Sequence, residues 1–427
     1  MSAISKFATI AAAGSGGSEY WVAAIGGASS ETSSSINFDP DGNIVVSGSV
    51  NTNVLALKTD PYGQLLWQTE IDSNPSKAEY VFDMATDSSG DIYIGCNSYA
   101  FGTYGGECLL KLNSSGNVQW LKGYTNAYGG QLKFIFVDGS DRIHAIGYGS
   151  TLSNRDYFIF NTSGGEIYKR RFYQNTTGAI DNPNAACISA SGNNVAITGR
   201  GNYDGVGFDG YFFEFGSTGL ITRNKRWYGS TTSKSEIAYG IALDSSETYY
   251  YVSVYSADAL GDVLFKFAKA SPATSVLKRE LSHRFNEIVS DNSGYMYGLF
   301  YGGSYSYIVK FDASFNIIWQ RYVNMGVTKI RIDANDNILI VGHMAAGFGS
   351  NDIVFAKLPG DGSGTGTYGG FFSYATTTAV SIGTTTPSYP YEFYYNTYSQ
   401  ASITASQSTK ATTETDPSLS YTTEAVS

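Results

Sequence analysis

Apolar and polar residues alternate in short runs along most of the chain, and clusters of Asp, Asn, Ser and Gly separate the runs. The clearest stretch reads "SINFDPDGNIVVSGSV" and, after a gap, "VLALKTDPYGQLLWQTEI", which ends at Ile71. Alternation of period two predicts half-buried strands, and the polar clusters predict tight turns between them. The stretch therefore predicts four consecutive antiparallel strands, which we call A, B, C and D.

The turn between strands A and B recurs along the chain. Its copies are "DPDGN" from Asp39, "DSSGD" from Asp87, "DGSDR" from Asp138, "SASGN" from Ser189, "DSSET" from Asp244, "DNSGY" from Asp291 and "DANDN" from Asp333. Asp, Asn and Gly supply the side-chain bonds and positive φ that tight hairpins need. Seven copies at a spacing typical of propellers predict seven four-stranded blades.

Strands C and D repeat as well. Large rings occupy one position of strand D, where a ring can cover the gap between blades: Trp67, Trp120, Tyr168 and Trp319. Strand B has small residues at a matching position, which indicates crowding: Gly48, Cys96, Gly147, Gly199 and Gly342. Blades 4 and 5 depart from the pattern, with Arg223 and the loose "ASPATSV", so their strand boundaries are less well defined.

The seventh blade lacks a convincing strand D, because its last copy runs into "PGDGSGTGTYGG". The missing strand is "SEYWVAAIGG" from Ser18, which carries Trp21 and has no strands A to C before it. A ring closed by both ends of the repeat region has no open sheet edge between its first and last blades. The sequence predicts an all-β, seven-bladed β-propeller over residues 18–370, preceded by an arm (1–17) and followed by a low-complexity attachment or docking tail (371–427).

The repeat, "D-x-S-G-N-I-Y-V-x-G" followed by "K-x-D-x-x-G-x-x-x-W", resembles the SBBP β-propeller repeat family of bacteria and phages over about residues 19–362. The opening "MSAISKFATIAAAG" and "KLPGDGSGTGTYGGFFSYATTT" are similar to segments of virion proteins of marine tailed phages, including cyanophages. These resemblances imply a non-enzymatic structural protein of the phage particle, associated with a tail or fibre. Alternatives are a capsid decoration or spacer protein and a bacterial surface propeller enzyme, a hydrolase or lyase.

The net charge of −10 and a pI near 4.8 argue against a nucleic-acid partner, because phosphate binding needs clustered Lys and Arg. No apolar run is long enough to span a bilayer, so no membrane insertion is expected, and the opening segment is read as an arm rather than a cleaved leader.

No cofactor, metal site or catalytic group is expected from the motifs. "DPDGN" lacks the distal Glu of a calcium loop, the three histidines fall in separate blades, and paired carboxylates such as Asp204 with Asp209 have no support. Cys96 and Cys108 lie in one predicted hairpin, so a disulfide bond between them is an alternative, but buried thiols are the favoured interpretation.

The connections from B to C and from D to A emerge on one face and vary widely, whereas the turns on the other face repeat. Binding residues concentrate on such variable loops, and rings with polar neighbours suit sugar or protein surfaces. Packing of the rings against one another is an equal alternative. The candidate ligand-binding residues are Tyr99, Phe101, Tyr104, Tyr128, Tyr203, Asp204, Phe208, Asp209, Tyr301, Tyr305 and Phe348.

The tail is rich in Ser and Thr, and its segment "SYPYEFYYNTYS" (residues 388–399) is aromatic enough for docking or for an intermolecular strand. We expect residues 1–17 and 371–427 to bind other virion proteins, and the variable face to bind a polysaccharide or protein of the host surface. The expected location is the virion, and a homo-oligomer is left open.

Overall fold

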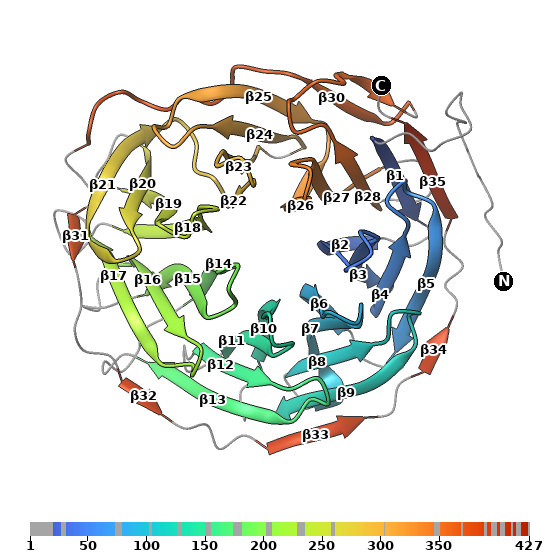
Figure 1. Cartoon of the computed structure of the whole chain (residues 1–427). Coiled ribbons are helices and arrows are strands. Elements are labelled where there is room, and N and C mark those ends of the chain that lie inside the picture. The colour runs from blue at the N-terminus through green and yellow to red at the C-terminus, as the bar shows by residue number, and fades with distance from the viewer. Residues whose placement is uncertain are drawn as a thin grey trace.

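The computed structural model describes residues 20–26, 31–72, 79–101, 105–125, 130–149, 155–173, 182–201, 207–228, 235–257, 261–302, 304–345, 351–368, 370–387, 391–393, 399–401, 406–410, 413–415 and 420–425. In this part of the chain the strands form seven antiparallel sheets around a central channel, which Figure 1 shows along the channel axis. The one helix among the described residues is a single 3-10 turn, Tyr99–Phe101. The predicted seven-bladed, all-β propeller is therefore confirmed.

Each blade has strands A to D in order from the channel outward. Blade 1 consists of β2 (Glu31–Phe38), β3 (Ile44–Val50), β4 (Asn53–Thr59) and β5 (Leu65–Asp72). Blade 2 consists of β6 (Glu79–Thr86), β7 (Ile92–Ser98), β8 (Gly106–Leu112) and β9 (Val118–Thr125). Blade 3 consists of β10 (Gly130–Val137), β11 (Ile143–Gly149), β12 (Arg155–Phe160) and β13 (Glu166–Tyr173).

The other blades follow the same order. Blade 4 consists of β14 (Asn182–Ile188), β15 (Asn194–Gly201), β16 (Asp209–Gly216) and β17 (Ile221–Tyr228). Blade 5 consists of β18 (Glu236–Leu243), β19 (Tyr249–Ser256), β20 (Asp262–Ala268) and β21 (Ser271–Leu281). Blade 6 consists of β22 (Glu287–Ser290), β23 (Met296–Tyr301), β24 (Ser306–Phe311) and β25 (Ile317–Val323).

Blade 7 is completed by the N-terminal strand, as the sequence predicts. It consists of β26 (Gly326–Ile332), β27 (Ile338–Met344), β28 (Asp352–Leu358) and β1 (Trp21–Gly26). Strands β1 and β28 pair from Trp21 with Lys357 to Ile25 with Ile353. All six residues of β1 are buried, and Trp21 packs edge-on against Phe355 at 5.6 Å. The first and last blades are thus joined through a fully packed strand.

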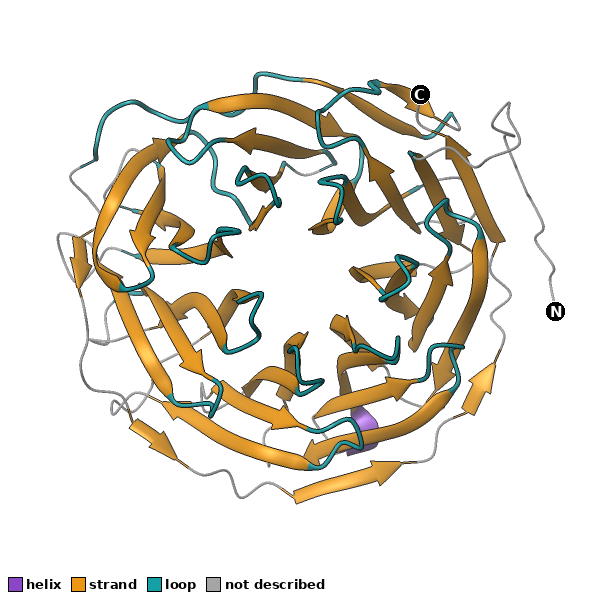
Figure 2. Cartoon of the chain, viewed as in Figure 1, coloured by secondary structure: helices purple, strands orange, loops and turns teal. Residues whose placement is uncertain are grey.

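The repeated Asp of the A to B turn stabilises the turn itself. In blade 1 the Asp39 Oδ1 accepts hydrogen bonds from the amides of Asp41 and Asn43, at 3.0 and 2.8 Å. The same pair of bonds recurs in blade 7, from Asn335 and Asn337 to Asp333. These turns surround the centre of Figure 2, where they are drawn in teal. Their side chains are used for local structure, as turn chemistry predicts.

A lysine of strand C joins each of several blades to the next. Lys310 forms an ion pair with Asp291 of its own blade at 3.1 Å, and its amine donates to the Gly360 carbonyl of blade 7 at 3.1 Å. Equivalent bonds to the next blade's C to D turn come from Lys58, Lys111 and Lys266. The aromatic side chain of strand D also joins neighbouring blades, since Trp67 donates its indole N–H to Ser114 O at 3.2 Å. The prediction that this side chain covers the gap between blades is confirmed at Trp67.

Strand B is as crowded as its glycines predict. A Cβ added at Gly48 would lie 2.2 Å from Thr32 O, and one at Gly342 would lie 2.3 Å from Gly326 O. In blade 2 the matching Cys96 instead bonds to Cys108 on the neighbouring strand, with an S–S distance of 2.06 Å. The favoured interpretation of Cys96 and Cys108 as free thiols is therefore wrong. Cys187 is the free cysteine, and burial raises the pKa of its thiol to about 12.

The C-terminal segment lies outside the ring (Figure 1). Its strands are β29 (Gly366–Tyr368), β30 (Phe372–Thr376), β31 (Tyr391–Phe393), β32 (Ser399–Ala401), β33 (Ser406–Lys410), β34 (Thr413–Thr415) and β35 (Ser420–Ala425). Except for β29, which pairs with β30, each pairs antiparallel with the outermost strand of a blade. The aromatic segment expected to dock on a partner thus contributes β31 to blade 4 of its own chain.

Candidate ligand site in the central channel

The innermost strands deviate from regular pairing at one recurring position. In six blades a register shift interrupts the pairing of strand A with strand B: at Ser33/Ser35, Val81/Asp83, Leu132/Phe134, Pro183/Ala185, Ala238/Ile241 and Val327/Lys329. A β-bulge redirects side chains, and such bulges are frequent next to functional sites. Because the six shifts fall at one recurring position of strand A, the bulges form a ring around the channel at one level of the propeller.

Side chains at these bulges connect neighbouring blades. Ser34 of blade 1 donates to Val81 O of blade 2 at 2.8 Å, and Asn184 of blade 4 donates to Ala238 O of blade 5 at 2.9 Å. In both cases the acceptor is the residue before the next bulge. The ring of bulges thus holds the innermost strands in a fixed relative position.

Asp83 is the most connected acid at this level. Its carboxylate is fully buried and accepts from Ser35 Oγ of blade 1 at 2.7 Å and from the Ile135 amide of blade 3 at 3.3 Å. Lys329 and Arg331 of blade 7 approach it at 3.8 and 3.9 Å. Asp83 therefore links four blades, including the two that meet at the closure of the ring.

Glu287 of blade 6 lies on the other side of the same two cations. Arg331 Nη1 contacts its Oε1 at 2.9 Å, and Lys329 Nζ contacts the same oxygen at 3.3 Å. The Ile330 amide donates to the second oxygen at 2.9 Å. Asp83, Glu287, Lys329 and Arg331 form what we call the channel cluster, in which two acids face two bases.

A cavity of about 420 Å³ opens beside the channel cluster. Glu287 and Arg331 contribute charged groups to its wall, whereas Ile135, Ile188 and Leu243 contribute apolar surface. A smaller cavity of about 110 Å³ lies near Glu287 and Lys329. Concave sites with apolar walls and a few convergent polar groups are the usual form of a small-molecule site.

Lys133 on the blade 3 bulge is a further group with altered chemistry. Its amine donates to Asn182 Oδ1 at 3.0 Å and to Pro183 O at 3.1 Å, both in blade 4. Burial, with a smaller contribution from the charge of Arg200, lowers the pKa of this amine to about 8. A lysine with such a pKa is partly neutral in mildly alkaline solution.

The residues predicted from the variable loops are distributed differently. Tyr301 and Tyr305 are about half exposed, and the ring of Tyr305 meets that of Tyr322 at 5.8 Å. Tyr99 is partly buried in the 3-10 turn, whereas Phe101 is buried in the core of blade 2, next to Gly123. Tyr104, Tyr128, Tyr203, Asp204 and Phe348 lie outside the described residues.

Phe208 and Asp209 stabilise blade 4 rather than project from it. The Arg200 guanidinium lies 4.7 Å from the centre of the Phe208 ring, and Asp209 forms an ion pair with Arg226. Phe101 is thus buried in the core, and Phe208 and Asp209 contact arginines of their own blade. Tyr301 and Tyr305 remain available on the surface of blade 6.

One histidine binds a turn carboxylate, but no metal site is formed among the described residues. Among the described residues no three His, Cys, Asp or Glu side chains are placed to hold a metal ion together. His144 is buried between Tyr157 Oη at 2.6 Å and Asp138 Oδ2 at 3.0 Å. Within the described part of the chain no helix is long and apolar enough to cross a membrane.

The channel cluster was not predicted from the sequence. Its members come from three innermost strands that are far apart along the chain, and the bulges that direct them have no distinct composition. One signal was present, because charged residues stand in strands that face the channel, as in "TKIRI" of blade 7. Buried charges need partners, and in this cluster the partners come from other blades.

No family model matches the chain, and no curated protein sequence matches it. Among solved structures, virginiamycin B lyase from Staphylococcus aureus is similar with a TM-score of 0.46 and 11% identity, over 79% of this chain and 99% of that one. A periplasmic gluconolactonase from Pseudomonas aeruginosa has a TM-score of 0.48 and 12% identity, over 70% and 94%. A polysaccharide lyase has a TM-score of 0.45 and 7% identity, over 77% and 90%.

These structures correct one expectation. The chain was predicted to be non-enzymatic, yet the solved propellers it is similar to include two lyases and a lactonase. The exclusion of enzymes is therefore wrong. At this level of identity the likeness concerns the fold and assigns no activity to the chain.

Proposed function

We propose that the protein is a ligand-binding propeller whose site is the central channel beside Glu287 and Arg331. The observation that carries the proposal is the cavity of about 420 Å³, walled by aliphatic side chains and by one side of the channel cluster. The ring around it is held by bulge side chains and by Asp83, so the site is preorganised. Preorganisation lowers the entropic cost of binding.

The chemistry of the wall favours a polyhydroxylated or zwitterionic molecule, such as a saccharide unit. Glu287 offers acceptor oxygens, and Arg331 offers planar donors beside them. Aliphatic residues such as Ile135 and Leu243 would contact the apolar faces of a sugar ring. A purely anionic ligand would instead meet the carboxylate of Glu287.

The test is binding of the full-length protein to a glycan array, followed by titration of each glycan that binds. Glu287→Gln removes the charge that faces Arg331, and we expect at least a tenfold loss of affinity. Asp60→Asn is the matched control, because Asn113 and Asn161 occupy the same turn position in blades 2 and 3. Equal affinities of the two variants would reject the channel as the site.

A second candidate is catalysis, which the altered Lys133 on the blade 3 bulge favours, although Lys133 does not line either of the two cavities. An amine with a pKa near 8 can accept a proton from a bound substrate at mildly alkaline pH. The binding assay is therefore repeated with detection of product from bound lactones and polysaccharides. If Lys133 is the base, Lys133→Met abolishes turnover while ligand affinity changes little, and turnover that survives this change would exclude it.

The biological setting proposed from the sequence resemblance is a phage particle, with attachment through residues 1–17 and 371–427 and recognition of a host-surface glycan or protein. Exposed Tyr301 and Tyr305, the latter with Tyr322 beside it, support a role for blade 6 in surface recognition. Mass spectrometry of purified particles tests the setting. Absence of the protein from purified particles would reject the phage setting and would leave the channel proposal unaffected.

A further inference from the structure

The C-terminal segment contacts every blade, and it does so at the same position. Its strands reach Val323 in blade 6, Trp227 in blade 4, Phe172 in blade 3, Tyr124 in blade 2, Ile71 in blade 1 and Ile25 in blade 7, and an isolated β-bridge reaches Leu281 in blade 5. Each of these residues is the fourth after the position that holds Trp67 in blade 1. The segment therefore follows the sevenfold order of the ring in reverse.

The segment itself contains a matching repeat. The residues opposite these seven positions are Tyr374, Ile382, Glu392, Gln400, Gln407, Glu414 and Tyr421. They lie in "SYA", "SIG", "YEF", "SQA", "SQS", "TET" and "SYT", and the last four copies are seven residues apart. Six of the seven copies begin with Ser or Thr. What reads as low complexity is thus a short motif with one copy for each blade.

We propose that residues 373–422 are a belt of seven strand motifs that recognises the outer edges of the propeller, one motif to each blade. A ring of equivalent blades offers equally spaced edges, so a belt that follows it needs a nearly constant spacing between motifs. The segment that covers these edges is the C-terminal segment of the same molecule. This inference is independent of the ligand proposed for the channel.

The physical reason is the open edge of the outermost strands. Without the belt, each strand D presents unpaired N–H and C=O groups that can pair with another chain. The belt pairs with these groups by backbone hydrogen bonds, which explains why its motif tolerates varied residues at the central position. Its last strand, β35, pairs with all six residues of β1, so both ends of the chain meet in blade 7.

The first part of the belt is anchored in the core. Phe372, directly before the belt, and Tyr374 are fully buried, and Val380 is nearly so, packed in the cluster that contains Leu281. The side chain of Gln320 in blade 6 binds the Val380 backbone twice. Its Oε1 accepts from the Val380 amide at 2.9 Å, and its Nε2 donates to the Val380 carbonyl at 2.7 Å. The belt is therefore fixed at its start and continues from there around the ring.

Limited proteolysis of the full-length protein tests the belt directly. Lys410 is the only Lys or Arg after Lys357, and it lies in β33, paired with Leu121. We expect trypsin to cleave after Lys410 at least tenfold more slowly in the folded protein than in a synthetic peptide of residues 402–419. Because the belt pairs within one molecule, this protection should not depend on protein concentration.

Proline substitutions test whether the strand motif causes the protection. Alternate residues of an edge strand direct their N–H to the partner, so one of Gln407→Pro and Ser408→Pro must remove a ladder bond. We expect that variant to be cleaved at least tenfold faster, and Thr404→Pro, between two motifs in the sequence, to behave as the unmodified chain. Cleavage at the peptide rate, protection that appears only at high concentration, or equal rates for all three variants would overturn the proposal.

Discussion

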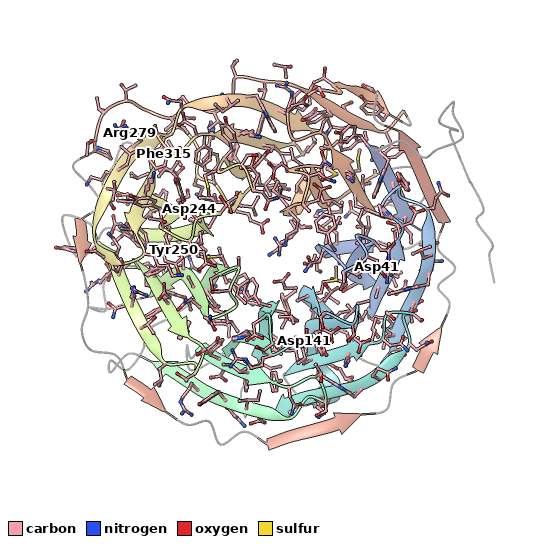
Figure 3. All side chains as sticks on the ribbon, in the orientation of Figure 1. Asp41, Asp141, Asp244, Tyr250, Arg279 and Phe315 are labelled. Carbon is pink, nitrogen blue, oxygen red and sulfur yellow. A yellow bond between two sulfur atoms is a disulfide. The ribbon has the colours of Figure 1, made fainter. Side chains whose placement is uncertain are left out.

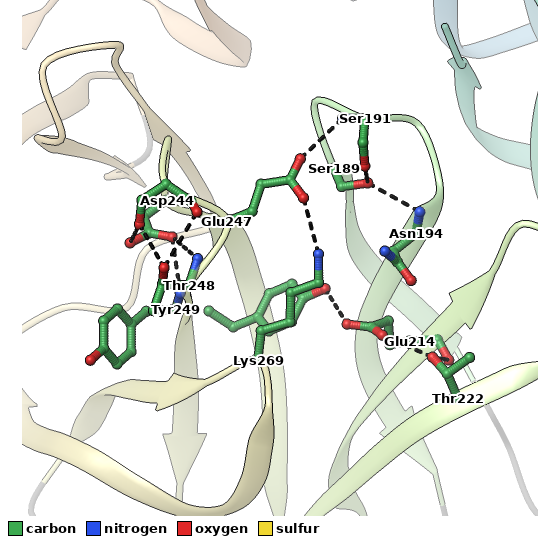
Figure 4. A network of polar contacts seen from close by, with 12 residues as sticks. Ser189, Ser191, Asn194, Glu214, Thr222, Asp244, Glu247, Thr248, Tyr249 and Lys269 are labelled. Atoms are coloured by element: carbon green, nitrogen blue, oxygen red, sulfur yellow. Dashed lines mark hydrogen bonds and ion pairs between the residues drawn. The ribbon is translucent and has the colours of Figure 1, made fainter. Parts of the chain in front are cut away.

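Three acidic residues take the place of glycine in the A to B turns. Asp141, Glu247 and Asp336 have positive φ angles of 57°, 54° and 64°, where blades 1, 2, 4 and 6 have Gly. Each carboxylate binds the turn of the preceding blade: Asp141 accepts from Ser88 N at 2.9 Å, and Glu247 accepts from Ser191 N at 3.0 Å. Figure 4 shows the contact of Glu247, which Lys269 also approaches. The backbone strain at these residues is thus offset by a bond between blades.

Substitution of Asp141 separates the strain from the bond. Asp141→Ala keeps a Cβ at positive φ and loses both bonds to Ser88, whereas Asp141→Gly loses the bonds but relieves the strain. We expect the alanine variant to lose about 2 kcal/mol of unfolding free energy and the glycine variant about 1 kcal/mol. Denaturant titration measures both, and equal losses would show that the φ angle of Asp141 carries no strain. Asp141 is among the residues labelled near the channel in Figure 3.

His144 makes the stability depend on pH. Burial lowers the pKa of His144 below its usual value of about 6.5, although Asp138 acts in the opposite direction. Below pH 6.5 the unfolded chain therefore binds a proton that the folded chain excludes, and stability falls as the pH falls toward the folded pKa.

The matched variants are His144→Gln and His283→Gln, the latter beside Ser282 and away from Asp138. We expect His144→Gln to melt at a lower temperature at pH 7, because its packing with Tyr157 is lost, but to lose less stability than the unmodified chain between pH 7 and pH 5. His283→Gln should keep the pH dependence of the unmodified chain. An unchanged slope for His144→Gln would contradict this account.

At the scale of elements, strands and turns could be predicted because their signals are local. Period-two alternation and the seven Asp or Gly turns identified all seven blades, with less well-defined strand boundaries in blades 4 and 5, and Trp21 identified the closing strand β1. The strands of the belt could not be predicted, because a run such as "SQS" carries no apolar periodicity. Pairing between distant edges depends on the completed ring rather than on the segment.

Deletion of β1 tests the closure of the ring. Removing residues 18–27 takes six buried residues and the pairing partner of both β28 and β35 from blade 7. We expect the melting temperature to fall by more than about 10 °C, since each large apolar side chain buried in a core contributes about 2 kcal/mol. Removing residues 1–14 is the control and should leave it unchanged. A similar melting temperature for both deletions would mean that β1 does not close the ring.

For the whole molecule, the number of blades and their order followed from the sequence, but the channel cluster did not. Glu287 meets Lys329 and Arg331 between the neighbouring blades 6 and 7, whereas Asp83 of blade 2 reaches these cations across the closure of the ring. The predicted loop residues divide between core and surface for the same reason, because burial of Phe101 or exposure of Tyr305 depends on neighbours that are distant in sequence. The site is therefore a property of the closed ring.

The most direct test of the channel as the binding site is a structure of the full-length protein determined with the molecule that the glycan array identifies. The account predicts density for that molecule in the central channel, within hydrogen-bonding distance of Glu287 and Arg331 and in contact with the aliphatic wall. Density over Tyr301 and Tyr305 on the surface of blade 6, with the channel empty of ligand, would contradict it.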